Sequence, residues 1–289
     1  MADNGKKSSE RLSIRDLQNM RQSNEKFCVT TACDFNTAQM VDQAGIEIVG
    51  AGGALASMVM KGEPNPFSAT MEEVIFLLSG VAKGAKRAIV SSGLPYGSFQ
   101  ESDEQAIRNA MRLVKTGAYY IKVEGKSDLM LKRMKAIIDV GIPVQGHVGL
   151  SPQLMRETDG FRVVGKSASE ALKVWDDMRR MEDIGVFMVE MECVPYRLAA
   201  QLCKKTSMLV VGVGSGSDTH GQALMREDIL GLQRTIAPKM VKQFADLWTP
   251  TVEALKLFST ETKNKQFPEQ SQMFKVDDDV YEEVMLKIK

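Results

Sequence analysis

The stretch YYIKVEGKSDLMLKRMKAIIDVGIPVQGHV, residues 119–148, contains the structural unit that is repeated along this chain. It begins with a strand pattern at 119–124, continues with an amphipathic helical pattern at 128–140, and ends in a second strand pattern at 144–148. Ser127 is a suitable N-cap for the helix, and Gly141 is a suitable residue to end it. A strand–helix–strand unit of this kind predicts two parallel strands in one sheet.

The same alternation of strands and helices extends along most of the chain. Helical patterns also cover residues 71–82, 104–116, 167–184 and 196–205, and the other predicted strands are 27–32, 46–50, 88–92, 186–192, 209–213 and a shorter segment near 222–225. About eight such units favour a single α/β domain with the (β/α)8 TIM-barrel fold. We expect an N-terminal segment with the first helix at 1–24, the barrel at 25–260, and a C-terminal tail with a helix at 261–289.

An open, doubly wound sheet with a glycine-rich phosphate loop is the alternative fold. The small residues of Val213-Gly-Ser-Gly-Ser217 follow a predicted strand, as such a loop would. The chain then continues with Asp-Thr-His-Gly and does not complete the GxGxxG pattern, so this signal alone is weak.

The composition argues against several classes of partner. The chain has 37 basic and 37 acidic residues, and this balance favours neither nucleic acid nor an anionic membrane. No apolar run approaches the ~18–20 residues of a membrane span, and the N-terminus lacks the apolar segment of a secretory signal. The four cysteines show no CxxC spacing, which argues against a zinc cluster or a redox pair. We therefore expect a cytoplasmic protein with free thiols.

Three predicted strands carry polar side chains at alternate positions, so that each set shares one face: Tyr120, Lys122 and Glu124; Gln145 and His147; Glu190 and Glu192. In a barrel these faces turn inward and meet near the C-terminal mouth, where active sites of this fold lie. A carboxylate there can act as a general base, and a lysine can neutralise an anionic substrate or intermediate. The alternative is a buried Lys–Glu ion pair with a structural role alone, and a His147 that is hydrogen-bonded to the backbone. For the whole set we favour a catalytic site.

Several motifs in one order, from about Leu12 to Phe267, resemble the ketopantoate hydroxymethyltransferase family of the phosphoenolpyruvate mutase/isocitrate lyase superfamily. They are Ile121-Lys-Val-Glu-Gly125, Gln145-Gly-His-Val-Gly-Leu-Ser-Pro-Gln153, Glu192-Cys-Val-Pro195, Val211-Gly-Val-Gly-Ser-Gly216 and Pro238-Lys-Met-Val-Lys-Gln-Phe244. The resemblance implies a (β/α)8 barrel, a high homo-oligomer such as a decamer, and a small 2-oxo acid as substrate. It also implies that Mg²⁺ chelates this acid and that methylenetetrahydrofolate donates the one-carbon unit.

The resemblance further implies roles for four residues of the predicted site. Glu192 would be the base that removes the proton beside the carbonyl. Lys122 and His147 would contact the substrate or enolate oxygens, and Glu124 would lie in the outer shell of the metal ion.

The chain departs from the family where the metal ion should be bound. The family's first metal-binding Asp corresponds to Ala51 or Gly53, depending on where a small insertion is placed. The second corresponds to Gly93, in Ser92-Gly-Leu-Pro95, and no Asp or Glu occurs between Glu47 and Glu63 or from Val74 to Gln100. Mg²⁺ requires hard oxygen ligands, usually including one or two carboxylates. We therefore predict no metal ligand at Ala51, Gly53 or Gly93. We expect these three residues, together with Ser92 and Glu124, to line the substrate site.

Two functions follow from this pattern. The first is an enzyme that forms or breaks a carbon–carbon bond beside the carbonyl of a 2-oxo acid, through an enolate and without the family's Mg²⁺ site. Lys122, His147 or His220, which replaces a family Asp, would then supply the missing positive charge. The second is a non-catalytic paralogue that keeps the barrel for assembly or metabolite binding.

Overall fold

The eight predicted strands form a closed barrel. The computed structural model describes residues 11–157, 160–234 and 238–288. The strands are β1 Phe27–Thr31, β2 Ile48–Gly52, β3 Ile89–Gly93, β4 Tyr120–Lys122, β5 Val144–Gly149, β6 Met188–Glu192, β7 Leu209–Val213 and β8 Gly221–Ala223. Each strand pairs in parallel with its sequence neighbours, and β8 pairs with β1 to close the barrel. The predicted (β/α)8 fold is confirmed, and the open doubly wound sheet is excluded.

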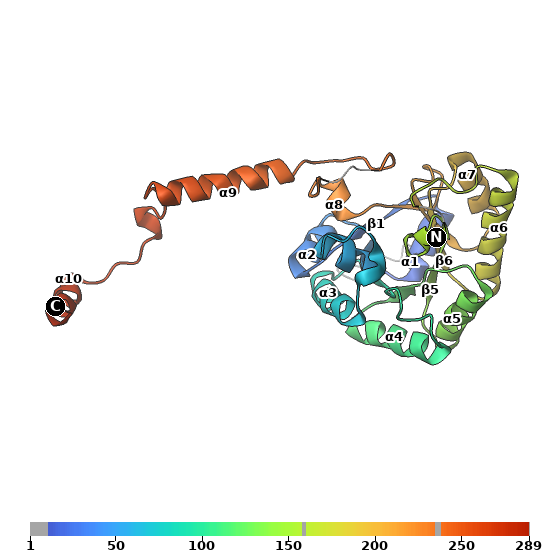
Figure 1. Cartoon of the computed structure of the whole chain (residues 1–289), viewed down its shortest axis with the longest axis horizontal. Coiled ribbons are helices and arrows are strands. Elements are labelled where there is room, and N and C mark those ends of the chain that lie inside the picture. The colour runs from blue at the N-terminus through green and yellow to red at the C-terminus, as the bar shows by residue number, and fades with distance from the viewer. Residues whose placement is uncertain (1–10, 158–159, 235–237, 289) are drawn as a thin grey trace, which may run out of the picture. The chain divides into compact units, whose positions relative to one another are not determined.

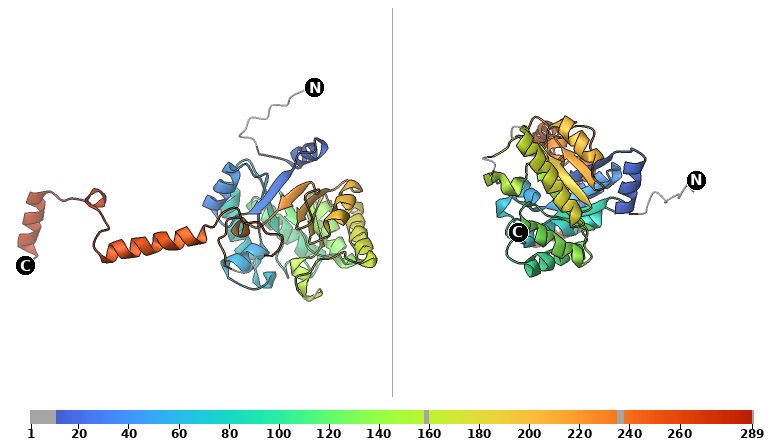
Figure 2. Two further views of the ribbon diagram at one scale, coloured as in Figure 1. Left: turned by 90° about the horizontal axis from the view of Figure 1, so that it is seen from above. Right: turned by 90° about the vertical axis from the view of Figure 1, so that its right-hand side faces the viewer.

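Helices surround this barrel, as Figures 1 and 2 show. They are α1 Ile14–Gln22, α2 Phe35–Gln43, α3 Met71–Gly84, α4 Asp103–Thr116, α5 Asp128–Asp139, α6 Ala168–Asp183, α7 Tyr196–Lys204 and the short α8 Arg226–Ile229. Shorter turns of helix occupy Leu55–Met60, Pro66–Ser68 and Pro152–Glu157, within the loops that follow β2 and β5. Ser127 accepts a hydrogen bond from the backbone of Met130, which confirms it as the N-cap of α5.

Strand alternation divides the apolar core into two clusters. The inner cluster fills the barrel and consists of Leu17, Phe27, Ile48, Ile89, Tyr120, Met188, Leu209 and Val211. The outer cluster lies between the strands and the helices and includes Val49, Val90 and Val189, which are the next residues along three of the same strands. Every member of the inner cluster is at most 1% exposed, so the barrel is packed on its N-terminal side and has room for polar chemistry only at the opposite end.

The end of the chain forms a second unit. It contains the described residues of 230–234 and 243–288, with helices α9 Trp248–Lys263 and α10 Asp278–Lys287 and a short turn at Gln270–Gln272. Neither α9 nor α10 contains a buried residue. The boundary therefore differs from the predicted one at 260, because α9 belongs to the second unit and not to the barrel. No helix among the described residues is long and apolar enough to cross a membrane.

Candidate active site

Three adjacent strands bring the predicted polar residues together at the C-terminal mouth. Lys122 at the end of β4 is in register with Gln145 on β5. On the next pair of strands, His147 is opposite Glu190, and Glu192 is opposite Gly149. Since the inward faces of these strands carry every second residue, the polar side chains lie directly above the inner cluster. The predicted convergence of a lysine, a histidine and glutamates is confirmed.

The ion pair between Lys122 and Glu190 is the shortest charged contact of the site, with 2.8 Å between Nζ and Oε1. Glu124 lies 3.9 Å from the same ammonium group. Burial alone would lower the pKa of Lys122, but Glu190 and Glu124 outweigh it and hold that pKa above its ordinary value. Burial would raise the pKa of Glu190, but Lys122 and then His147 keep it below its ordinary value. These two carboxylates therefore hold Lys122 as a charged ammonium group.

Gln145 completes the environment of Glu190. Its side-chain nitrogen donates to Oε2 of Glu190 at 3.2 Å, so that each carboxylate oxygen has its own donor. Glu190 shares the inward face that alternation predicts for 190 and 192, but the resemblance assigned a role to Glu192 alone. The sequence signal that could have identified Glu190 is its position two residues before Glu192 on the same strand, which puts both side chains on one face.

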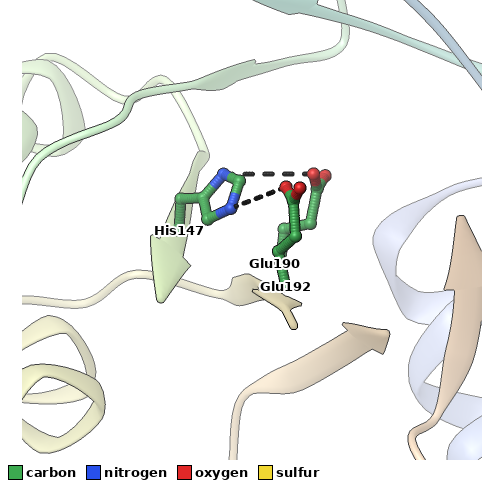
Figure 3. Close-up of side chains that lie close together, drawn as sticks. All are labelled: His147, Glu190 and Glu192. Atoms are coloured by element: carbon green, nitrogen blue, oxygen red, sulfur yellow. Dashed lines mark ion pairs between the residues drawn. The ribbon is translucent and has the colours of Figure 1, made fainter. Parts of the chain in front are cut away.

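His147 lies beside two carboxylates, as Figure 3 shows. Its Nε2 is 3.3 Å from Oε2 of Glu192, and its Nδ1 is 3.9 Å from Oε1 of Glu190. The side chain is fully buried, and neither ring nitrogen makes a hydrogen bond of good geometry. The imidazole can therefore pass a proton to Glu192, receive one from it, or offer a nitrogen lone pair to a ligand.

Glu124 connects the mouth to the loop that follows β5. One of its carboxylate oxygens accepts a hydrogen bond of 3.0 Å from the backbone nitrogen of Gln153. The side chain of Gln153 in turn donates to the carbonyl of Leu94, beyond the end of β3, at 3.0 Å. Glu124 thus holds the loop in place, a contact that strand periodicity could not predict because Gln153 lies outside the strands.

The positions that replace the family's metal-binding Asp residues carry no ligand atoms. Ala51 is in the outer cluster, so its side chain points away from the mouth. A Cβ on Gly53 would lie 3.2 Å from Pro95, and a Cβ on Gly93 would lie 3.8 Å from the Cβ of Lys122. None of these three positions carries a side-chain carboxylate of the kind that usually binds Mg²⁺, and Glu124 contacts Gln153 and Lys122.

Two further predictions concern Ser92 and His220. Ser92 is buried with no partner for its hydroxyl group, and alternation places it on the opposite strand face from Gly93.

The prediction that His220 supplies charge at the mouth is wrong. His220 precedes β8 at the N-terminal end of the barrel, where its Nδ1 accepts a hydrogen bond from Val210. Burial, followed by Arg21 and Lys26, lowers the pKa of His220 to about 4, so the ring is neutral at pH 7.

Comparison with known proteins agrees with the motifs in the sequence. The family model for ketopantoate hydroxymethyltransferase matches residues 11–270. A 3-methyl-2-oxobutanoate hydroxymethyltransferase from Clostridium botulinum is 36% identical over 266 residues, which cover 92% of this chain and 96% of the relative. The enzyme of the same name from Nitrosopumilus maritimus is 34% identical and covers 92% of this chain and 94% of its own.

Solved structures show the same fold at low sequence identity. Phosphonopyruvate hydrolase, in a complex with oxalate and Mg²⁺, has a TM-score of 0.59 at 10% identity and covers 95% of this chain and 97% of its own. 2,3-Dimethylmalate lyase, a member of the PEP mutase/isocitrate lyase superfamily, has a TM-score of 0.56 at 11% identity, with coverages of 96% and 99%. The family model and the curated relatives span nearly the whole barrel, and the chain therefore belongs to the ketopantoate hydroxymethyltransferase family.

Proposed function

We propose that this protein forms or breaks a carbon–carbon bond beside the carbonyl of a small 2-oxo acid, through an enolate and without the family's Mg²⁺ site. The observation that carries the proposal is the juxtaposition of Glu192, His147 and Lys122 at the mouth of the barrel. The curated relatives named 3-methyl-2-oxobutanoate hydroxymethyltransferase make this acid the first substrate to test. Methylenetetrahydrofolate is the proposed one-carbon donor, as the resemblance implies.

Glu192 is the proposed general base. Its carboxylate takes a proton from the carbon beside the carbonyl, and the electron pair of that C–H bond moves into the enolate. Water adds to the methylene carbon of the donor, and its two C–N bonds break, which releases tetrahydrofolate and leaves formaldehyde. The enolate carbon then bonds to the carbon of formaldehyde, and the electron pair of its C=O bond becomes an alkoxide that takes the proton from Glu192. In the reverse direction the same bond breaks and the enolate takes a proton from Glu192. The 3.3 Å contact with His147 gives this carboxylate a partner with which to share the proton.

Lys122 and His147 are the proposed stabilisers of the enolate oxygen. A proton beside a ketone is acidic enough for a carboxylate base only if the developing negative charge is stabilised. The raised pKa of Lys122 keeps an ammonium group at the mouth for this purpose, although Glu190 already engages it at 2.8 Å. We therefore expect a lower rate than in a metal-assisted site, or a more acidic substrate.

Proton exchange tests the proposal without a one-carbon donor. The EDTA-treated protein is incubated with 3-methyl-2-oxobutanoate in D₂O, and the loss of the C3 proton signal is followed by NMR. We expect catalysed exchange that falls at least ~100-fold in Glu192→Gln, because the general base is lost. Glu25→Gln is the matched control, since Glu25 is an exposed carboxylate at the opposite end of the barrel. Exchange that Glu192→Gln leaves unchanged contradicts the assignment of the base.

A non-catalytic paralogue is the second candidate. The absence of a carboxylate at Gly93 and at the end of β2 favours it, because these positions would hold the family's Mg²⁺. Turnover of the acid with methylenetetrahydrofolate separates the two candidates. Turnover that EDTA does not abolish supports the enzyme. Neither turnover nor proton exchange, with or without Mg²⁺, supports the paralogue.

A further inference from the structure

We propose that His147, Glu190 and Glu192 form a binding site for one divalent transition-metal ion of the Zn²⁺, Mn²⁺ or Co²⁺ class. This site is on β5 and β6, whereas the positions that correspond to the family's metal-binding carboxylates are at the ends of β2 and β3. Binding of the ion goes beyond the proposed function and does not depend on it.

Three potential ligand atoms lie close together at the mouth of the barrel. One ring nitrogen of His147 and one carboxylate oxygen from each glutamate all lie within 4.8 Å of one another. Ions of this class bind nitrogen and oxygen ligands at about 2.0–2.2 Å, so ligand atoms around one ion are separated by roughly 3–4 Å. The register of β5 and β6 holds the backbones of these residues beside one another, so the remaining approach of the ligand atoms to one ion would come from the side chains, with Glu190 keeping or exchanging its contacts with Lys122 and Gln145.

The buried imidazole is the second observation that indicates a ligand. His147 is 0% exposed, and neither of its ring nitrogens has a hydrogen-bond partner of good geometry. An unpartnered buried polar group is costly and is rare in folded proteins. Figure 3 marks the ion pairs that join the imidazole to the carboxylates of Glu190 and Glu192. A metal ion on one nitrogen would satisfy its lone pair, and the other nitrogen would carry the proton.

Charge at the mouth also favours a cation. Glu124, Glu190 and Glu192 bring three carboxylates together, and Glu124 and Glu190 both contact the ammonium group of Lys122. Lys122 offsets one of these charges, and buried carboxylates are stable only when they are compensated. A divalent ion would offset the other two.

The donor set selects the class of ion. Imidazole is a good ligand for zinc and its neighbours in the first transition row, whereas Mg²⁺ prefers six oxygen ligands and keeps several waters. We therefore expect Zn²⁺ to bind about 100-fold more tightly than Mg²⁺, or more.

Occupancy of the site would oppose the proposed reaction. A carboxylate that ligates a cation is a weaker base, and Glu192 is common to both roles. We therefore expect Zn²⁺ to lower proton exchange and EDTA to restore it. This consequence alone rests on the proposed function.

The test is metal binding by the full-length protein after EDTA treatment and dialysis, without substrate. Zn²⁺ is titrated by calorimetry, and Co²⁺ by its visible absorption. We expect one saturable site per chain, weakened at least ~10-fold by His147→Ala and by Glu190→Gln. His220→Asn removes the other histidine of the chain, and Cys28→Ser removes an exposed thiol, and neither should change the affinity.

No saturable binding, or binding that His147→Ala leaves unchanged, overturns the proposal. If Glu190→Gln does not fold, pulsed EPR of the Mn²⁺ complex of the unmodified protein replaces it. Coupling of the electron spin to an imidazole nitrogen is expected there, and its absence overturns the proposal. A protein that binds Zn²⁺ but shows no proton exchange after EDTA treatment would disprove the proposed function and leave the metal site standing.

Discussion

Lys122 on β4 and Glu190 on β6 form an ion pair of 2.8 Å across the interior of the barrel, although β5 separates their backbones. The pair links two strands that share no backbone hydrogen bonds with each other. It also ties the proposed oxyanion-stabilising charge to a carboxylate that is one ligand of the proposed metal site.

Removal of one partner should cost more stability than removal of both. Glu190→Gln leaves the Lys122 ammonium with the more distant Glu124 and the charge of Glu192, and we expect the free energy of unfolding to fall by about 2–4 kcal/mol. In Lys122→Met/Glu190→Gln neither member of the pair is left facing an empty partner, and the remaining loss is the 3.9 Å contact of Glu124 with Lys122. Chemical denaturation of both single variants and the double variant gives the coupling, expected at about 1–3 kcal/mol. Additive losses would show that the ion pair contributes nothing measurable.

Restoring a carboxylate should be tolerated at Gly93, the last residue of β3, but not at Ala51. A Cβ on Gly93 meets nothing closer than 3.8 Å, so Gly93→Asp should fold and place its carboxylate beside Lys122. Ala51→Asp would bury a charge in the outer cluster and should cost about 3 kcal/mol or more. Urea denaturation compares the two variants. A loss in Gly93→Asp as large as that in Ala51→Asp would contradict the assigned strand faces.

His220 should make the protein less stable in mild acid. Its folded pKa of about 4 lies below its ordinary value of 6.5, so between these values the unfolded chain binds more protons than the folded one. The contribution of His220 is complete above pH 6.5 and is lost as the pH falls through 4, with a slope of at most about 1.4 kcal/mol per pH unit.

Denaturation midpoints at pH 7.5 and pH 5 measure this effect. His220→Asn keeps an acceptor for the Val210 backbone nitrogen but does not titrate in this range. The midpoint should therefore depend less on pH in this variant than in the unmodified protein. An equal dependence in both proteins would exclude His220 as the source.

The cysteines should differ in their reactivity. Burial, followed by Glu192, raises the pKa of Cys193 to about 12, and burial raises that of Cys203 to about 11. Cys28 is exposed, although burial of part of the side chain also raises its pKa. Ellman's reagent at pH 8 should therefore modify Cys28 first, and Cys28→Ser should remove the fastest phase. A fast phase that survives this substitution would have to come from another thiol.

Much of the barrel could be predicted because the strands repeat a simple pattern. Alternation at Lys122 and Glu124, and again at Glu190 and Glu192, predicts which side chains face the mouth. The pattern does not predict distance along the barrel axis or between strands. Alternation therefore could not predict that Glu190 is closer to Lys122 than Glu124 is.

The errors have related physical causes. His220 adjoins a strand as expected, but it lies before β8, and a residue before a parallel strand is at the opposite end from the active site. The contact of Gln153 with Glu124 depends on the path of a loop, which periodicity does not describe. The boundary of the second unit depends on packing. The helix α9 buries no residue, and its sequence pattern does not indicate this.

The inner cluster has a consequence for the order of events at the mouth. Because Phe27, Tyr120 and Leu209 fill the barrel below Lys122, the packed core closes the route to the site from the N-terminal end of the barrel. Substrate and product must therefore both pass through the C-terminal mouth, and we expect that they cannot occupy the site at once. A product of the proposed reaction should therefore inhibit competitively against the 2-oxo acid, whatever donor is used.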